Sequence, residues 1–274
     1  MEESAEKRGL RNAWGRIATT YEDGWATRLV PFAERGLDLM APVPAGRGLD
    51  VGCGPGYTTA ALAARTGEAL GVDFAPAMVE RATEVFGDRP GVGFALDDAE
   101  ALGQEDGSFE VVSCSFGLMY CYDARAAMAE MARVLRPGGR MLQVVWGRAP
   151  EVWFVPVIEL IESRAEYYAT ICPLMFFYGL PGVLERMVRE AGLDLVGHET
   201  IEGRMRYATP DEAVDAAVHG GPLAGLFENR LGEAAQAEVR DALRAHVEAL
   251  AEPDGDGISL PAQVVVAVGS RPAR

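Results

Sequence analysis

Residues 47–65, RGLDVGCGPGYTTAALAAR, decide the fold of this chain. A short apolar run that contains Asp50 breaks into a turn with Gly52, Gly54 and Gly56, and a helical pattern follows at once. Glycine is required where the backbone turns sharply and a ligand approaches it, because a Cβ would occupy that space. A strand, a glycine turn and a helix in this order leave backbone N–H groups free at the helix N-terminus. The stretch therefore predicts a ligand site above the strand.

Length and charge limit the class of protein and its partners. The chain has 274 residues, enough for one large domain or for one domain with a cap. Its formal charge of −16 would repel a phosphate backbone, so neither nucleic acid nor an anionic membrane is an expected partner. No run reaches the roughly 20 apolar residues of a membrane span, and the N-terminus shows no apolar targeting segment. We expect a cytoplasmic enzyme, a monomer or homodimer, that acts on a small molecule.

Residue types exclude several chemistries. The cysteines, at 53, 114, 121 and 172, form no Cys-x-x-Cys pair and have no histidine at metal spacing, so neither zinc nor a disulfide framework is predicted. Lys7 is the only lysine, which argues against a Schiff base and a P-loop. PDGDG, at 253–257, resembles a calcium loop but lacks the third ligand and the terminal glutamate, so we predict a turn.

Strand and helix patterns alternate through the first half of the chain. Further strands are predicted at 68–72, 92–96, 109–115 and 141–146, with helices at 76–86 and 124–135. This spacing fits right-handed crossover units, and hence an α/β fold with the ligand site at the carboxyl ends of the strands. Two late strands, 194–207 and 262–268, are expected to pair antiparallel at the sheet edge and bring the total to seven.

Two acidic residues bear on the nature of the ligand. Asp73 ends the second predicted strand, 21 residues after Gly52, where a carboxylate can accept hydrogen bonds from a ribose diol. The alternative is a carboxylate that caps the helix beginning at Pro76. Asp50, just before the turn, disfavours the two phosphates of a dinucleotide and suits a cationic ammonium or sulfonium.

Two segments outside this alternation are rich in aromatic residues. Residues 11–40 read as helical, with an aromatic stripe that either packs on the domain or closes over a ligand as a lid. Residues 151–169 and 172–182 are either core or the apolar wall of a substrate pocket. We expect an N-terminal helical lid (1–46), a ligand-binding core (47–147), a cap insertion over the active site (148–192), and C-terminal strands and helices that complete the sheet and pocket (193–274).

Taken together, the motifs resemble the class I S-adenosylmethionine-dependent methyltransferases of the type 11 domain, in particular the branch related to ubiquinone and menaquinone C-methyltransferases. LDVGCGPG (49–56) matches the first motif of that family and GVDFAPAMVERA (71–82) the second. DAEAL (98–102) with DGSFEVVSCSFGL (106–118) matches the third and fourth, and EMARVLRPGGR (130–140) the helix and turn before the fifth strand. The resemblance implies a Rossmann-like core that binds S-adenosylmethionine.

The resemblance also implies which residues hold the methionine end of this cofactor. Gly52, the Cys53 backbone and Gly54 would lie against the methionine, and the backbone at Ser115 would complete its site. Asp50 would hold the ammonium group, directly or through water.

For the adenosine end, the resemblance assigns five further residues. Asp73 would take the ribose hydroxyls, while Phe74 and Met78 would flank the adenine. Asp98 would accept a hydrogen bond from the adenine amino group, and the Ala99 N–H would address the ring.

Two positions depart from the family pattern. Asp97 stands where the family often has glycine, and it is the less favoured adenine ligand. Met119 stands where related sequences often carry histidine, so a base at that position is absent.

The reaction and the acceptor are less sharply defined. Methyl transfer from a sulfonium needs alignment more than a strong base, so the catalytic residues stay unassigned. Side chains that could serve as a base are Tyr21, Asp123, His198, His219 and His246, the last on an expected surface helix. The expected substrate-pocket residues are Trp14, Tyr21, Met119, Tyr120, Trp146 and Trp153.

These aromatic segments favour an apolar or aromatic acceptor, such as a quinone, phenol or polyketide of specialised metabolism, with O-methylation ahead of C- or N-methylation. Two alternatives stay open. One is an enzyme that binds the same cofactor for other chemistry, such as a cyclase. The other is an NAD(P)-dependent oxidoreductase or a non-catalytic binding module.

Overall fold

A sheet with parallel central strands organises the structure, a computed structural model that describes residues 4–165 and 174–273. Its seven-strand path runs β3-β2-β1-β4-β5-β8-β6, and β7 adds an eighth strand beside β8. The α/β fold predicted from the sequence is confirmed, with one short strand more than expected. The strands are β1 (Gly46–Val51), β2 (Gly67–Asp73), β3 (Val92–Leu96), β4 (Phe109–Ser115), β5 (Leu135–Trp146), β6 (Asp194–Tyr207), β7 (Glu252–Asp254) and β8 (Gly257–Ser270).

The late strands close the sheet as an antiparallel edge, as predicted. β8 pairs antiparallel with β5 and with β6. It begins five residues before the predicted start at 262, because its first residues pair with β6 on one side and with β7 on the other. The predicted turn in PDGDG is found, with Gly255 at φ 62° in the loop between β7 and β8.

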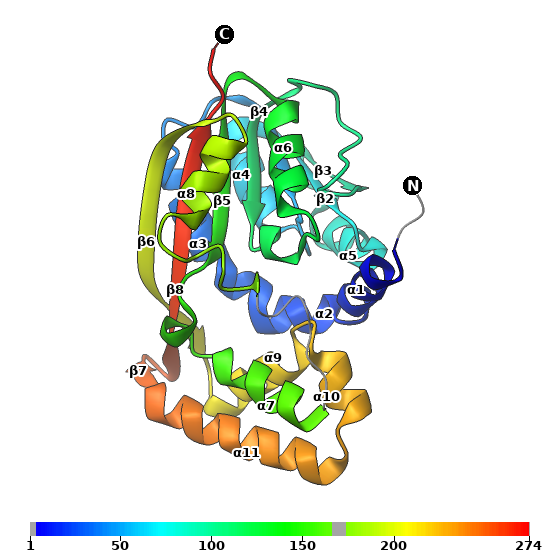
Figure 1. Ribbon diagram of the computed structural model, residues 1–274, viewed down its shortest axis with the longest axis vertical. Coiled ribbons are helices and arrows are strands. Elements are labelled where there is room, and N and C mark those ends of the chain that lie inside the picture. Colours follow the sequence, from blue (N-terminus) through cyan, green and yellow to red (C-terminus); the bar gives the residue numbers. More distant parts are fainter. Residues whose placement is uncertain (1–3, 166–173, 274) are drawn as a thin grey trace.

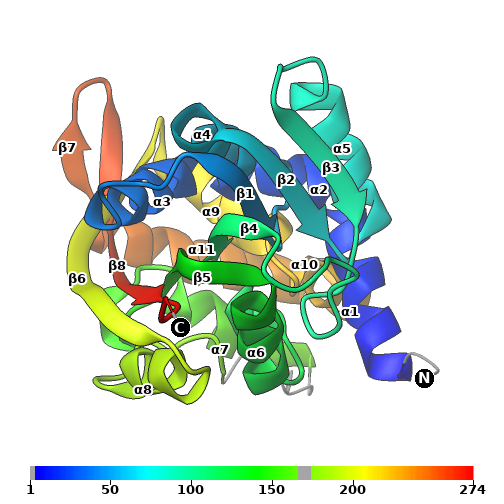
Figure 2. The same cartoon turned by 90° about the horizontal axis from the view of Figure 1, so that it is seen from above.

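Helices cover both faces of the sheet. Figure 2 shows α3, α4 and α5 on one face and α6 and α8 on the other. Apolar side chains fill the space between these layers, and Leu49, Val112 and Leu142 on three neighbouring strands are fully buried. The helices of these two layers are α3 (Thr27–Leu39), α4 (Tyr57–Thr66), α5 (Pro76–Phe86), α6 (Ala124–Val134) and α8 (Val183–Glu190).

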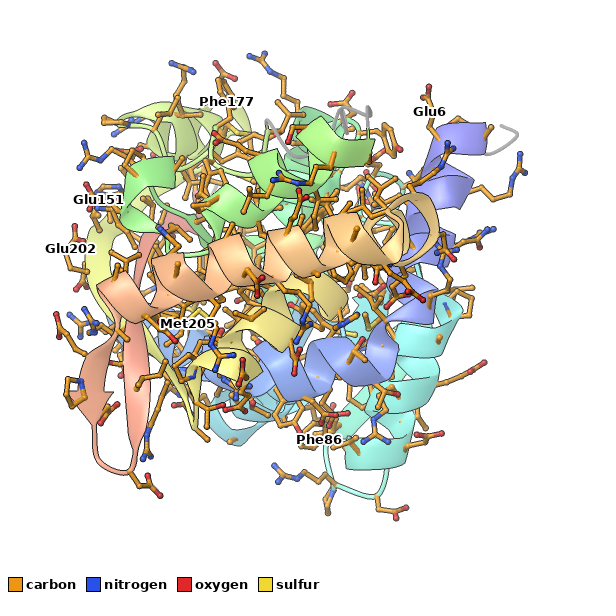
Figure 3. All side chains as sticks on the ribbon, turned by 90° about the horizontal axis from the view of Figure 1, so that it is seen from below. Glu6, Phe86, Glu151, Phe177, Glu202 and Met205 are labelled. Atoms are coloured by element: carbon orange, nitrogen blue, oxygen red, sulfur yellow. The ribbon has the colours of Figure 1, made fainter. Side chains whose placement is uncertain are left out.

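A separate layer of helices lies beyond the sheet. Figure 1 shows α7, α9, α10 and α11 gathered in the lower half of the molecule, with α2 between them and the sheet. Seen from below, α11 lies between α7 and α9, both of which it contacts (Figure 3). These helices are α7 (Val155–Ala165), α9 (Pro210–His219), α10 (Ala224–Arg230) and α11 (Glu233–Leu250).

The N-terminal segment differs from the single helical pattern expected at 11–40. It begins earlier, with α1 (Ala5–Arg16) and α2 (Ala18–Tyr21), and a π-helical segment (Glu22–Ala26) joins α2 to α3. The physical reason is that its aromatic stripe serves two clusters. Trp14 packs with Met78 and Ala224, whereas Trp25 packs in the main core, and the change of helical winding lies between them.

The start of β5 is a second difference. RPGG, at 136–139, was predicted as a turn before a strand at 141, yet the strand already begins at Leu135. The register shifts between the pairs Phe109–Leu135 and Val111–Arg140, and Gly138 has φ 78°. The glycines therefore form a bulge inside the strand, not a turn ahead of it.

No helix among the described residues is long and apolar enough to cross a membrane. Cys172 and the aromatic residues at 167 and 168, which belong to the predicted cap, lie outside the described residues.

Candidate functional site

The glycine turn between β1 and α4 is fixed by its backbone. Gly52, Gly54 and Gly56 have φ angles of 71°, 51° and 89°, which disfavour other residue types. The N–H groups of Gly52 and Cys53 both donate to the carbonyl of Val72, at 2.8 and 3.0 Å. A Cβ on Gly56 would lie 2.7 Å from the ring of Phe94. The turn is thus held against the end of β2.

Asp73, at the end of β2, ties this turn to the next helix. One carboxylate oxygen accepts from the Gly54 N–H at 3.0 Å and the other from the Ala75 N–H at 2.9 Å. Through the bond from the N–H of Ala75, the N-cap residue of the helix that begins at Pro76, Asp73 also has the alternative role at the start of this helix that the sequence left open. Burial raises the pKa of Asp73 to about 6, against the backbone hydrogen bonds, which lower it. The carboxylate also lines a cavity, so it can accept from a ligand as well.

Asp50, near the end of β1, is engaged by hydroxyl groups. It is buried beneath the turn, and its two oxygens accept from the hydroxyls of Thr59 and Ser113, each at 2.7 Å. Burial raises its pKa to about 6, and the two hydroxyls oppose this shift. Asp50 does not line the cavity, so of the two predicted contacts with a ligand ammonium the structure disfavours the direct one, and the contact through water stays a prediction. The Cys53 N–H donates to Val72 and its side chain is buried, so the predicted contact of its backbone with the methionine stays a prediction.

Beyond β3, acidic side chains meet the lysine of α1. Lys7 Nζ lies 2.5 Å from Asp98 and 3.0 Å from Glu100. Burial lowers the pKa of Lys7, but its bonds to these two carboxylates outweigh burial and raise it. Asp97 instead accepts from the N–H groups of Asp98 and Gly103, at 2.8 and 3.0 Å, and so shapes the loop. The sequence did not point to Lys7 because nothing placed the first helix beside α5 and the loop that follows β3.

These groups surround a first cavity, with about 750 Å³ of open space including its mouth. The Ser115 hydroxyl at its wall is buried and has no hydrogen-bond partner among the described residues, so a bound ligand can satisfy it. Eight of the ten predicted cofactor residues line this cavity: Gly52, Gly54, Asp73, Phe74, Met78, Asp98, Ala99 and Ser115. The residues present thus fit an adenosyl ligand that carries hydroxyl and amino donors.

A second cavity of about 550 Å³ adjoins the first. It is lined by aromatic and aliphatic residues from the N-terminal helices, β5, α7 and α9, and none of the described residues in its wall is charged. Four aromatic residues belong to both cavities: Trp14, Tyr21, Phe116 and Tyr120. We call these four residues the shared wall. Within it, the Trp14 ring meets the rings of Tyr21 and Tyr120 edge-on, at centroid distances of 5.2 and 4.8 Å.

The predicted substrate-pocket residues divide into two groups. Trp14, Tyr21, Tyr120 and Trp146 line the second cavity. The other two predicted residues, Met119 and Trp153, line neither cavity, so the prediction is corrected for them. Met119 is fully buried in the main core, and Trp153 stacks on Trp25 with ring centroids 6.0 Å apart.

Phe116 is a site residue that no sequence pattern indicated. It follows β4 directly and has φ 59°, the only positive φ among the described residues that are not glycine. Such a backbone costs of order 1–3 kcal/mol and is held by its surroundings. Here the Phe116 N–H donates to Val144 at 2.8 Å, and its ring packs on Trp146 at 4.6 Å. Phe116 lines both cavities.

Most of the candidate bases line neither of the two cavities. His198 pairs with Glu185 and His219 with Glu228. His246 lies on α11, whose residues are mostly exposed, and its half-buried ring meets the Trp153 carbonyl at 3.0 Å. Asp123 caps α6. Of the five candidates only Tyr21 lines a cavity, and burial raises its pKa well above the ordinary value.

The fold and the site define an α/β enzyme class that holds an adenosyl ligand at the carboxyl ends of parallel strands, beside an apolar acceptor space. Residues 49–143 match the sequence profile of a family described as a methyltransferase domain. A ubiquinone/menaquinone biosynthesis C-methyltransferase of Acidiphilium cryptum is 31% identical over 200 residues, or 67% of this chain and 76% of that protein. The chain belongs to the class I S-adenosylmethionine-dependent methyltransferases, and S-adenosylmethionine is its cofactor.

Other comparisons agree with this family. A demethylmenaquinone methyltransferase of Beutenbergia cavernae is 29% identical over 179 residues, covering 61% of this chain and 73% of that protein. The fold is shared with the [4+2]-cyclase SpnF, with a TM-score of 0.58 and 20% identity over 89% of this chain and 81% of that one.

Proposed function

We propose that this chain transfers the methyl group of S-adenosylmethionine to an apolar or aromatic small molecule bound in the second cavity, with oxygen as the favoured acceptor atom. The observation that carries the proposal is the shared wall. A cavity lined by the expected cofactor residues and an uncharged cavity meet at four aromatic side chains. A donor and an acceptor held on either side of that junction would be neighbours.

The residues around the cavities have separate roles in this proposal. When bound, the cofactor supplies a methyl group already activated on a positively charged sulfur. Asp73 and the Ser115 hydroxyl bind and orient the cofactor, and the glycine turn allows the cofactor to approach the backbone closely. The shared wall excludes water and aligns the acceptor. Alignment of two reactants can lower a barrier by about 7–11 kcal/mol, so no strong base is required for the transfer.

Relatives favour a ring-shaped acceptor. One similar protein is named a demethylmenaquinone methyltransferase and another a ubiquinone/menaquinone biosynthesis C-methyltransferase. The second cavity is aromatic and uncharged among its described residues. A quinone, phenol or polyketide of specialised metabolism would suit such a space. We further propose that residues 1–46 act as a lid and that the cap predicted at 148–192 covers the site with α7, since α8, near its end, packs on the sheet instead. A cytoplasmic location, a monomeric or homodimeric state and the lack of nucleic-acid partners stay predictions.

The proposal is tested with S-adenosylmethionine that carries an isotopically labelled methyl group. The chain is incubated with a panel of phenols and hydroxyquinones, and the products are analysed by mass spectrometry. We expect the label in a methylated product, together with an equal amount of S-adenosylhomocysteine. A reaction product without the label would instead favour cofactor-dependent chemistry such as cyclisation, an alternative kept open by the uncharged cavity.

A further inference from the structure

The second cavity offers an acceptor little help in losing a proton. Among the described residues in its wall, only Tyr21 and Tyr120 carry an ionisable group. Burial raises the pKa of Tyr21 well above its ordinary value, so its phenol stays neutral at neutral pH. A neutral phenol is a poor general base. No described histidine lines either cavity.

The ionisable groups of the first cavity have partners of their own or are neutral thiols, and Asp73 is also assigned to the cofactor. Asp73 accepts from two backbone N–H groups, Asp97 from the loop backbone, and Asp98 and Glu100 pair with Lys7. Burial raises the pKa of the Cys114 thiol to about 12 and that of Cys121 well above its ordinary value, so both are neutral. Tyr122 is the remaining ionisable residue in the described wall of the first cavity, and it does not line the second cavity.

We infer that the acceptor ionises by itself, before the methyl transfer, and that the substrate class is therefore the acidic oxygen nucleophile: a carboxylic acid, a hydroxyquinone or a similar vinylogous acid, rather than an alcohol. This inference rests on the proposed function. The acceptor loses its proton to water. Its oxygen lone pair then forms the bond to the methyl carbon, while the S–C bond breaks and its electron pair stays on sulfur. The charges −1 and +1 combine into two neutral products.

Electrostatics favours the same class of acceptor. An apolar cavity penalises a lone anion, whereas a positive charge within about 4–6 Å favours it. The described wall of the second cavity supplies no cation. The cofactor's own positive charge would be the counterion, so an acidic acceptor would be held as an anion only beside the charged donor.

A binding experiment tests this without turnover. The probe is 2-hydroxy-1,4-naphthoquinone, whose absorbance reports its ionisation, bound with either sinefungin, which is cationic, or S-adenosylhomocysteine, which is neutral at sulfur. We compare the proton concentration at which half of the bound probe is ionised. It should be at least about tenfold higher in the sinefungin complex than in the S-adenosylhomocysteine complex. Equal ionisation in the two complexes would overturn the inference.

A rate experiment supplies the second arm, with 1-naphthol as the weakly acidic acceptor of the same skeleton. We expect the pH dependence of labelled transfer to follow the ionisation of each acceptor. The same should hold in the variants Tyr21→Phe and Tyr120→Phe. His219→Gln, which changes a residue outside both cavities, serves as the control. One inflection shared by both acceptors, and lost in a tyrosine variant, would overturn this inference and leave methyl transfer standing. Absence of both binding and transfer for every acceptor would overturn the proposed function as well.

Discussion

At the scale of single residues, Asp73 carries the most weight because it joins the glycine turn, the start of α5 and the first cavity. Asp73→Ala should weaken binding of S-adenosylhomocysteine about tenfold or more, since a hydrogen bond to a charged group is worth roughly 1.5–3 kcal/mol. Titration calorimetry measures the affinity. The exposed Asp88→Ala serves as the control, and unchanged affinity in Asp73→Ala would remove this residue from the site.

Buried carboxylates also predict a pH dependence of stability. Burial raises the pKa of Asp50 from 3.8 to about 6, so the native chain keeps a proton that the unfolded chain releases between these values. The resulting stabilisation is fully present below about pH 4 and is lost as the pH rises through about 6; it amounts to at most about 3 kcal/mol. Urea unfolding from pH 4 to 7 should show a smaller loss of stability for Asp50→Asn than for the wild type. Identical pH profiles would contradict this.

The glycine turn allows steric exclusion to be separated from backbone strain. Gly182→Ala, at the left-handed N-cap of α8 with φ 78° and no atom within 4 Å of the added Cβ, should lose only the strain of a left-handed residue, about 1–2 kcal/mol. Gly56→Ala meets the Phe94 ring as well, so it should lose more stability and also affinity for S-adenosylhomocysteine. Thermal unfolding and calorimetry compare the two variants, and equal losses would argue against the close packing of the turn.

At the scale of elements, the π-helical segment anchors the N-terminal helices to the cofactor side of the fold. The buried Glu22 accepts from the Tyr57 hydroxyl at 2.8 Å and from Arg81, so it reaches both α4 and α5. Glu22→Ala leaves both donors without this partner, at a cost of about 1–3 kcal/mol. We expect residues 5–39 to exchange their amide hydrogens faster in Glu22→Ala than in the control variant Glu34→Ala, which changes an exposed position on α3. Unchanged exchange would show that this contact does not hold the segment.

Local sequence patterns predicted the elements well where each element serves a single layer. The alternating strands, the helix beginning at Pro76 and the antiparallel edge all follow from periodicity and turn residues. The pattern failed where tertiary packing divides one segment, as between Trp14 and Trp25, whose side chains enter different clusters. It failed again at the bulge of β5, since whether glycines end a strand or bend it depends on the partner strand.

For the whole molecule, the sequence located the cofactor site better than the acceptor site. Gly54, Asp73 and Ser115 belong to motifs with fixed spacing, so their meeting at one sheet edge could be expected. Lys7 and Phe116 reach the cavities through long-range packing and a strained backbone, which no local pattern contains. Trp153 shows the opposite error, because aromatic composition alone does not tell a core residue from a pocket wall.

The measurement that tests the central claim most directly is a crystal structure with S-adenosylhomocysteine bound. We expect the ribose hydroxyls at Asp73 and the sulfur at the shared wall, facing the second cavity. A sulfur atom turned away from Trp14, Tyr21, Phe116 and Tyr120, or an adenosyl group bound outside the first cavity, would contradict the assignment of the two cavities to donor and acceptor.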